Sequence, residues 1–334
     1  MCGIIDNLDL TMVAVLDRYY LSITLLVTVA YQLSGFAIAY TLQFDVAASS
    51  NRWIPADFSP ENYGLDRRIQ LSDSGQALRF LFFRVLKTGH DGRFDEIRRS
   101  FFKFLGFWIA QILWVWVVSL PVVILNSPAV SDVDSGGSNP KFGTSRDVAG
   151  VVLWALGFVI ESAADAQKYR YKSSKSSPKD RPIEKGVWAY SRHPQYFGEM
   201  MCWFGIWILC LSPTTNGSLP SSARAAQYGA IVSPVLTVVV LMFGSGMPTS
   251  AKPQAKRFYL KSYGPDARPE DAIIWAGYKE YLNRVSILVP LPPFIYAPLP
   301  RIVKRTVLFD FPMFQFNEET DGPAAIEEAT QRST

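Results

Sequence analysis

The 334-residue sequence lacks the short motifs that mark the common soluble nucleotide-binding and hydrolytic sites. It contains no Walker loop, Rossmann glycine motif, HExxH or GxSxG, which excludes the usual forms of those sites. Its three cysteines, Cys2, Cys202 and Cys210, have no metal or redox spacing. The N-terminal residues lack the basic region of a cleavable signal peptide, so none is expected. We also expect no metal and no nucleic-acid partner.

Long apolar blocks are present instead, and 49% of the residues are hydrophobic. A helix needs roughly 20 apolar residues to cross a bilayer. The blocks predict spans near 19–43, 101–126, 147–167, 196–212 and 228–248. A shorter apolar stretch with interspersed basic residues, 77–87, is typical of an interfacial helix. The sequence therefore predicts an all-α, polytopic membrane helix bundle with about five spans plus interfacial helices.

Three segments follow one another in the predicted organisation. Residues 1–76 contain the first membrane helix and an irregular polar segment. Residues 77–290 form the main membrane domain. Residues 291–334 are a proline-rich tail, acidic after 317, which we expect to be disordered.

Basic residues are distributed unevenly among the loops. They concentrate in 84–103, in 168–192 and after 249, whereas loops 127–146 and 213–227 have few. Because positive loops stay cytoplasmic, this alternation predicts a cytosolic C-terminus. The sequon that begins at Asn216 falls in a loop assigned to the lumen, in agreement. We expect an integral protein of the endoplasmic reticulum or a related membrane, in contact with membrane lipids.

Two acids lie near the cytoplasmic end of the third predicted span. Glu161 and Asp165 are four residues apart, which puts both carboxylates on one helix face. Like charges near hydrocarbon need a partner. They either pair with Lys168 or Arg170, or face a cavity open to the cytoplasm and bind the hydroxyl groups of a ligand.

The stretch SRHPQYFGE, 191–199, opens the fourth predicted span with polar groups. Arg192 and His193 precede the helix, and Tyr196 and Glu199 follow on one of its faces. Pro194 at the helix start and Gly198 four residues later indicate a tight turn beside close packing. Arg192 alone can be read as an anchor for lipid phosphates. Together, cationic, aromatic and acidic groups at one membrane depth fit a phosphorylated nucleotide.

Basic and aromatic residues directly follow the last predicted span and form two short helices, KRFYLKSYG and AGYKEYLNR, on either side of a turn. Tyr278 and Tyr281 lie in the second helix. These helices either form a lid over the nucleotide or lie on anionic lipid.

Several stretches together resemble the steroid 5α-reductase-like membrane oxidoreductases, most closely a broadly distributed branch often found in fungi. They are FLFFRVLKTGHDGRFDEIR, FWIAQILWVWVVSLPVVILNS, GFVIESAADAQKYRYK, GVWAYSRHPQYFGEMMCWFGIW and GSGMP. The resemblance covers about 76–290. Its RHPxY motif is also found in sterol double-bond reductases and isoprenylcysteine methyltransferases.

The resemblance implies a bundle of membrane helices that binds NADPH from the cytosol. By the resemblance, Glu161, Asp165, Lys172, Arg257 and Tyr259 match positions that contact the cofactor in the family. Gln195 and Glu199 match the Asn and Glu of the corresponding family motif, and Arg192 and His193 match the RH that this branch shares with sterol reductases. We expect all nine, together with Tyr196, to bind the cofactor. The implied reaction is hydride transfer to the β-carbon of a polarised double bond in a lipid or sterol-like substrate. The family's donor acid in an early helix has no counterpart, because 19–43 contains no acid, and Tyr31 is the remaining candidate.

Two other functions stay open. An S-adenosylmethionine-dependent methyltransferase also carries RHPxY, although its usual paired acids after the last span are absent before Asp266. A catalytically inactive scaffold is the second alternative, because 44–76 is polar where family members carry further hydrophobic helices.

Overall fold

The protein is described from a computed structural model, over residues 17–42, 100–134, 136–138, 140–178, 180–215 and 218–333. Within these ranges the regular elements are helices, and the β-type contact is an isolated parallel bridge between Ser191 and Ser286. The all-helical prediction is therefore confirmed. The polar segment 44–76, the interfacial helix expected at 77–87 and Asn216 lie outside the described residues.

Three helical stretches are long and apolar enough to cross a membrane, namely Phe101–Ser131, Ser145–Ser173 and Ser221–Tyr263. They contain the predicted spans 101–126, 147–167 and 228–248, so the chain is a membrane protein. The other two predicted spans correspond to helices α2, Leu21–Leu42, and α8, Pro194–Cys210. With 17 residues, α8 is about 25 Å long, which is less than a hydrocarbon core of about 30 Å. Crossing by α2 and by α8 stays a prediction.

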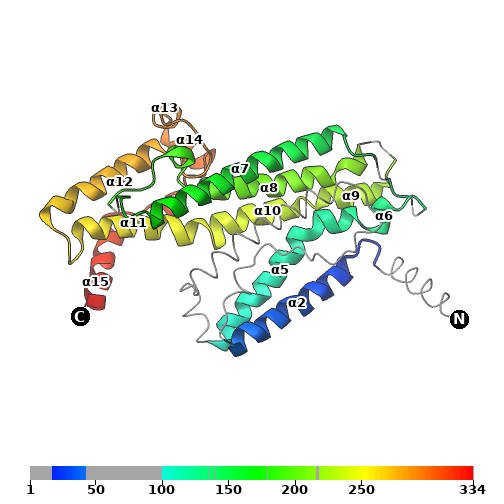
Figure 1. Cartoon of the computed structure of the whole chain (residues 1–334), viewed down its shortest axis with the longest axis horizontal. Coiled ribbons are helices and arrows are strands. Elements are labelled where there is room, and N and C mark those ends of the chain that lie inside the picture. The colour runs from blue at the N-terminus through cyan, green and yellow to red at the C-terminus, as the bar shows by residue number, and fades with distance from the viewer. Residues whose placement is uncertain are drawn as a thin grey trace. The chain divides into compact units, whose positions relative to one another are not determined.

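The chain divides into two compact units, one of Met1–Ala149 and Ile206–Leu236 and the other of Gly150–Gly205 and Thr237–Thr334. In the first unit, α2 lies beside α5, Phe101–Leu125 (Figure 1). The ring of Phe36 contacts those of Phe104 and Trp108 at centroid distances of 5.5 and 6.4 Å. These aromatic contacts supply the apolar packing between the two helices.

The remaining elements of the first unit are α6, Pro128–Ser131, the start of α7, Ser145–Ser173, the end of α8, the 3₁₀ turn η4, Ser212–Thr214, α9, Ser221–Gly229, and the start of α10, Val232–Val239. The carboxylate of Asp147 accepts hydrogen bonds from the backbone amides of Gly143 and Thr144, both at 2.9 Å. The guanidinium of Arg146 donates to the hydroxyl of Tyr228 at 2.9 Å. These bonds fix the beginning of α7.

In the second unit, α7 and α8 approach closely through glycine. A Cβ added to Gly198 would lie 2.6 Å from the carbonyl oxygen of Gly157 and 2.7 Å from the amide nitrogen of Glu161. Neither backbone atom can move away without displacing its helix. The close packing expected around Gly198 is therefore confirmed, and it brings Glu161 against the first turns of α8.

The second unit continues with the 3₁₀ turn η3, Gly186–Ala189, the π-helical turn η5, Val240–Gly244, α11, Met247–Tyr263, the turn η6, Pro269–Asp271, and α12, Ala272–Arg284. The two basic-aromatic helices predicted after the last span are thus confirmed as α11 and α12, which lie side by side (Figure 1). Phe258 of α11 stacks on Tyr278 of α12 with ring centroids 4.4 Å apart. The site described below is built around this pair of helices.

The prediction of a disordered tail from 291 is wrong over the described part of that segment. It contains α13, Pro293–Tyr296, α14, Arg301–Thr306, the turn η7, Pro312–Phe314, and α15, Asp321–Ser333. Tyr296 and Phe314 are buried in the second unit, and Phe314 packs in a cluster with Met200 and Met247. The physical reason is the run FDFPMFQF, whose aromatic side chains offset the entropy of ordering this part of the chain.

Candidate functional site

The ten residues predicted to bind a cofactor all belong to the second unit. Glu161, Asp165 and Lys172 lie on α7, Arg192 and His193 in the turn before α8, Gln195, Tyr196 and Glu199 in the first turns of α8, and Arg257 and Tyr259 on α11. Tyr31, the candidate proton donor, lies on α2 in the first unit and is 52% exposed. Its role stays a prediction.

The turn that carries Arg192 is fixed by hydrogen bonds to the segment after α12. The hydroxyl of Ser191 donates to the carbonyl of Leu288 at 2.8 Å and accepts from the amide of His193 at 3.1 Å. The amide of Arg192 donates to the carbonyl of Ser286 at 2.8 Å. These bonds hold the backbone at Arg192 in place against the segment after α12.

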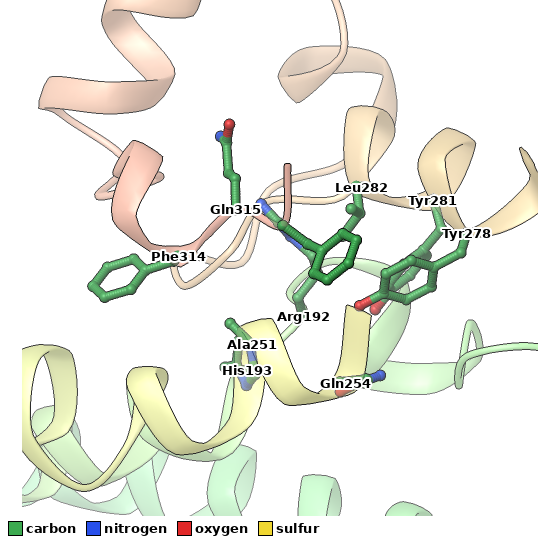
Figure 2. A pocket seen from close by; sticks show the side chains of 10 residues that line it. Arg192, His193, Ala251, Gln254, Tyr278, Tyr281, Leu282, Phe314 and Gln315 are labelled. Carbon is green, nitrogen blue, oxygen red and sulfur yellow. The ribbon is translucent and has the colours of Figure 1, made fainter. Parts of the chain in front are cut away.

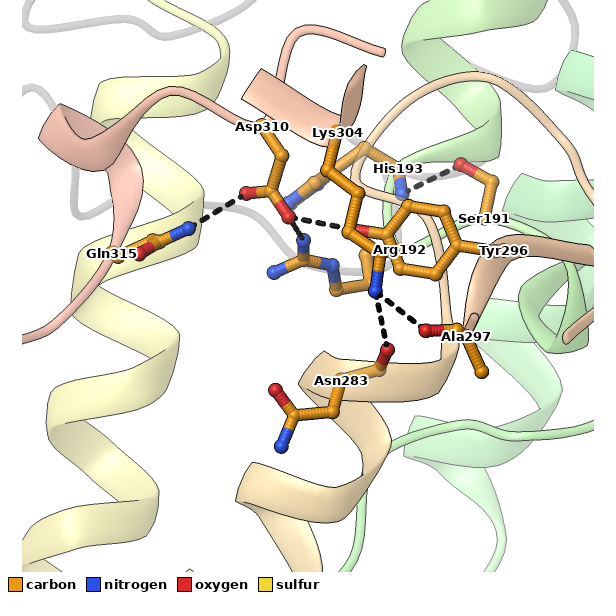
Figure 3. A network of polar contacts seen from close by, with 9 residues as sticks. All are labelled: Ser191, Arg192, His193, Asn283, Tyr296, Ala297, Lys304, Asp310 and Gln315. Carbon is orange, nitrogen blue, oxygen red and sulfur yellow. Dashed lines mark hydrogen bonds and ion pairs between the residues drawn. The ribbon is translucent and has the colours of Figure 1, made fainter. Parts of the chain in front are cut away.

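The side chain of Arg192 ends in an ion pair with Asp310 of the tail (Figure 3). Nη2 of Arg192 lies 2.6 Å from Oδ2 of Asp310, and the side chains are 10% and 7% exposed. Asp310 also accepts from the Tyr296 hydroxyl at 2.7 Å and from the Gln315 amide at 3.3 Å. Burial acts to lower the pKa of Arg192, but the carboxylate of Asp310 raises it, and the net pKa lies above the ordinary value.

One edge of the Arg192 guanidinium has no such partner. Its Nε is buried and makes no hydrogen bond to any residue that the structure describes. The same holds for Oε1 of Gln195, a side chain that is 9% exposed. Buried polar atoms are nearly always paired with protein or with a bound molecule. These two atoms are therefore the features of the site that best fit a ligand.

His193 is buried and its ring stacks on that of Tyr196, with centroids 5.4 Å apart and planes inclined by 10°. Burial, together with the positive charges of Arg192 and Lys168, lowers the pKa of His193 to about 3. The imidazole is consequently neutral at physiological pH. The hydroxyl of Tyr196 donates to the carbonyl of Gly246 at 3.3 Å, which links this stacked pair to the turn before α11.

The predicted residues of α7 differ in exposure. Glu161 is 8% exposed and lies against Gly198, whereas Asp165 is half-buried and Lys172 is exposed. Lys168, one turn before Lys172, places its ammonium 5.5 Å from the centre of the Trp188 ring. Its charge acts on His193, so this end of α7 lies near the Arg192 turn.

The predicted residues of α11 have different surroundings. The positive charges of Arg192 and Arg257 both act on the hydroxyl of Tyr278, whose pKa burial raises to about 12. The Arg257 guanidinium lies 5.3 Å from the centre of the Phe258 ring, which stacks on Tyr278. Tyr259 instead packs edge-on against Trp275 at 5.4 Å and against Phe316 of the tail at 5.1 Å. It contributes to the contact with the tail rather than to the cationic cluster.

A small cavity of about 20 Å³ lies beside Arg192 (Figure 2). Its lining residues are Arg192, His193, Ala251, Gln254, Tyr278, Tyr281, Leu282, Phe314, Gln315 and Phe316. In Figure 2, Arg192 lies between Phe314 and Gln315 of the tail on one side and Tyr278 and Tyr281 of α12 on the other. Sites for small molecules enclose on the order of 300–1,000 Å³. As it stands, the cavity holds no more than a water molecule or two.

Sequence analysis missed Asp310, Gln315 and Gln254 as members of this site. For Gln254 the sequence contains no cue beyond its place on a helix. For the tail residues there was a cue, because four phenylalanines between 309 and 316 are unusual for a disordered segment. Of the ten predicted cofactor-binding residues, the cavity includes Arg192 and His193. The other eight do not line it, namely Glu161, Asp165, Lys172, Gln195, Tyr196, Glu199, Arg257 and Tyr259.

Comparison with known proteins shows which family the chain belongs to. The profile of a family described as a protein of unknown function (DUF1295) matches residues 77–264, which is more than half of the chain. Neither the curated proteins nor the solved structures contain a match.

Proposed function

The chain belongs to the DUF1295 family, and we propose that it is an NADPH-dependent membrane reductase that saturates a carbon–carbon double bond in a lipid or sterol-like substrate. The proposal adopts the resemblance of 76–290 to the steroid 5α-reductase-like oxidoreductases. It includes an orientation in which the Arg192 end of the second unit faces the cytosol, in the endoplasmic reticulum or a related membrane.

One observation carries the proposal. Cations from three separate elements lie beside aromatic rings of the second unit. Lys168 lies 5.5 Å from the centre of the Trp188 ring and Arg257 lies 5.3 Å from that of Phe258. Arg192 lines the cavity together with Tyr278 and Tyr281. A dinucleotide phosphate carries several negative charges beside flat rings, and guanidinium groups are well suited to bind its oxygens. Cations grouped around buried aromatic side chains match that pattern of charge and shape.

The unpartnered atoms support the same ligand. Nε of Arg192 is a buried donor that a phosphate oxygen would satisfy, and Oε1 of Gln195 is a buried acceptor that an amide or hydroxyl group would satisfy. Chemically the residues fit NADPH. In volume they fit it only when the tail residues that line the cavity move, because about 20 Å³ is far too little for a dinucleotide.

The reaction divides into parts that the chain and the cofactor supply. When bound, NADPH supplies the hydride for the β-carbon, and one proton goes to the α-carbon, so that the double bond becomes single and NADP⁺ is released. Arg192 and Arg257 would hold the phosphates. The neutral imidazole of His193, stacked on Tyr196, would line that side of the site. Tyr31 stays the candidate for delivering the proton.

Transfer of deuterium tests the proposal. Purified protein in sterol-containing vesicles is incubated with NADPH deuterated at the reactive carbon of the nicotinamide. We expect a lipid that has gained one deuterium and one hydrogen, detected by mass spectrometry, together with an equal amount of NADP⁺. Absence of deuterated lipid across sterol, prenol and unsaturated acyl substrates would refute the reductase.

Two alternatives predict other results in this experiment. A methyltransferase would transfer a labelled methyl group from S-adenosylmethionine, although the sulfonium of that cofactor is disfavoured beside three cations. An inactive scaffold would transfer neither label, and the small size of the cavity is the observation that favours it.

A further inference from the structure

Acidic residues of the tail pair with the cations of α11, of α12 and of the turn before α8. Asp310 pairs with Arg192 at 2.6 Å, Lys252 with Asp321 at 3.2 Å and Lys279 with Glu318 at 2.9 Å, and Lys256 also pairs with Glu328. In each pair the acid comes from 310–328. We call the part of the tail from Leu308 to Ser333 the C-terminal strap.

The strap also fills the site with aromatic side chains. Phe314, Gln315 and Phe316 are three of the residues that line the cavity beside Arg192. The ring of Phe316 lies 5.1 Å from that of Tyr259 and 5.6 Å from that of Trp275. A Cβ added to Gly322 would lie 2.7 Å from the Tyr259 hydroxyl, so α15 begins in close contact with α11. The volume that a cofactor needs is therefore occupied by the chain itself.

We infer that the C-terminal strap is autoinhibitory, with the carboxylate of Asp310 occupying at Arg192 the position of a phosphate group of the nucleotide. The inference rests on the proposed function and adds its regulation. A bound nucleotide displaces Asp310 from Arg192, Phe314 and Phe316 leave the cavity, and the site opens to its full volume. Removal of the strap's contacts then increases the apparent affinity for the nucleotide.

The contacts of the strap differ in strength. The pairs made by Lys252, Lys256 and Lys279 have side chains that are 31–47% exposed, and exposed ion pairs contribute little. The Arg192–Asp310 pair is buried and the two phenylalanines are partly or fully enclosed, so these three contacts hold the strap. The 2′-phosphate of NADPH is a monoester with more negative charge than a carboxylate, and it competes for the same guanidinium.

Hydrogen exchange of the unmodified protein gives the first test. Amide exchange is followed by mass spectrometry in detergent, with and without NADPH. We expect NADPH to slow exchange in 192–199 and to speed it in 308–316. Slower exchange in 192–199 with unchanged or slower exchange in 308–316 would overturn the inference, because the nucleotide would then bind with the strap in place. No change in either segment would refute the proposed function itself.

Strap variants give the second test, in which the dissociation constant of NADPH is measured by its fluorescence. Asp310→Asn retains a group that can accept a hydrogen bond from Arg192 but removes the competing negative charge. Phe316→Ala removes one of the aromatic rings that line the cavity. We expect each to bind NADPH about tenfold more tightly or better, because apparent affinity is reduced by the closed fraction. Glu270→Gln removes an exposed acid outside the strap and should bind as the parent does. Equal affinity of all four proteins would overturn the inference.

Discussion

The guanidinium of Arg192 and the carboxylate of Asp310 lie 2.6 Å apart although 118 residues separate them in the chain. Both side chains are nearly buried, and the Tyr296 hydroxyl and the Gln315 amide also donate to the carboxylate. Arg192, which was predicted to bind a cofactor, is thus paired with a residue of the tail. This single pair connects the stability of the second unit with access to its candidate site.

Removing the carboxylate should destabilise the protein. Asp310→Ala leaves the charge of Arg192 buried without its partner, and such a loss costs about 3–5 kcal/mol. We expect a clearly lower melting temperature of the detergent-purified protein. Lys252→Ala, which breaks the exposed pair with Asp321, should cost less than about 1 kcal/mol. Similar melting temperatures for the two variants would show that the buried pair is not a stabilising contact.

The close contact of α7 and α8 at Gly198 predicts that a larger residue there lowers the stability of the protein. Gly198→Ala would place a Cβ 2.6 Å from the Gly157 carbonyl, and overpacking of this kind costs about 1–3 kcal/mol. Gly106→Ala in α5 is the matched control, because no atom lies within 4 Å of the added Cβ. It should leave stability unchanged or raise it by up to about 1 kcal/mol through helix propensity. Thermal unfolding of both variants checks the difference, and an equally stable Gly198→Ala protein would contradict the close approach.

His193 predicts how stability depends on pH. Its folded-state pKa of about 3 lies below the unfolded value of about 6.5, so between these values only the unfolded state takes up a proton. The free energy of unfolding should therefore fall as pH is lowered through this window, by up to about 1.4 kcal/mol per pH unit. His193→Asn should remove that contribution. His90→Gln, which changes the chain's other histidine, is the control.

Melting temperatures of the three proteins are compared between about pH 5 and about pH 8, the range in which an ordinary histidine titrates. The His193→Asn variant should lose less stability on acidification than the parent does. Parallel curves for all three would mean that the imidazole of His193 is protonated as readily in the folded protein as in the unfolded chain.

We expect a substitution of Arg257 to weaken NADPH binding and to leave folding unchanged. Its guanidinium stands over the ring of Phe258 and makes no ion pair to any described residue. Arg257→Gln should weaken NADPH binding about tenfold or more, because a hydrogen bond to a charged group is worth about 1.5–3 kcal/mol. Arg268→Gln, an exposed arginine of the loop before α12, should bind NADPH as the parent does. Equal dissociation constants for the two variants would remove Arg257 from the site.

Local pattern was sufficient for much of the fold. Apolar length predicted three of the candidate spans, and the aromatic and basic residues after the last span predicted α11 and α12. Pro194 and Gly198 predicted the tight start of α8 and its close packing, because proline and glycine act through backbone geometry that does not depend on distant partners.

Contacts between segments that are distant in the chain could not be predicted from the local sequence pattern. Arg192 was predicted to face a ligand or lipid phosphates, and nothing in the sequence around it points to Asp310. The tail was predicted to be disordered from its prolines and acids, yet its phenylalanines order it against α11 and α12. Tyr259 was predicted to touch the cofactor, and its ring packs instead on Trp275 and Phe316, since an aromatic residue on a helix suits a core as well as a site.

Ligand-dependent thermal stability tests the central claim most directly. The detergent-purified full chain is melted with NADPH, NADH and S-adenosylmethionine at equal concentration, because a ligand that binds only the folded state must raise the melting temperature. We predict that NADPH stabilises the protein more than either of the others, and that Asp310→Asn enlarges this shift. Selective stabilisation by S-adenosylmethionine, or no stabilisation of the parent and of Asp310→Asn by any of the three, would contradict the account.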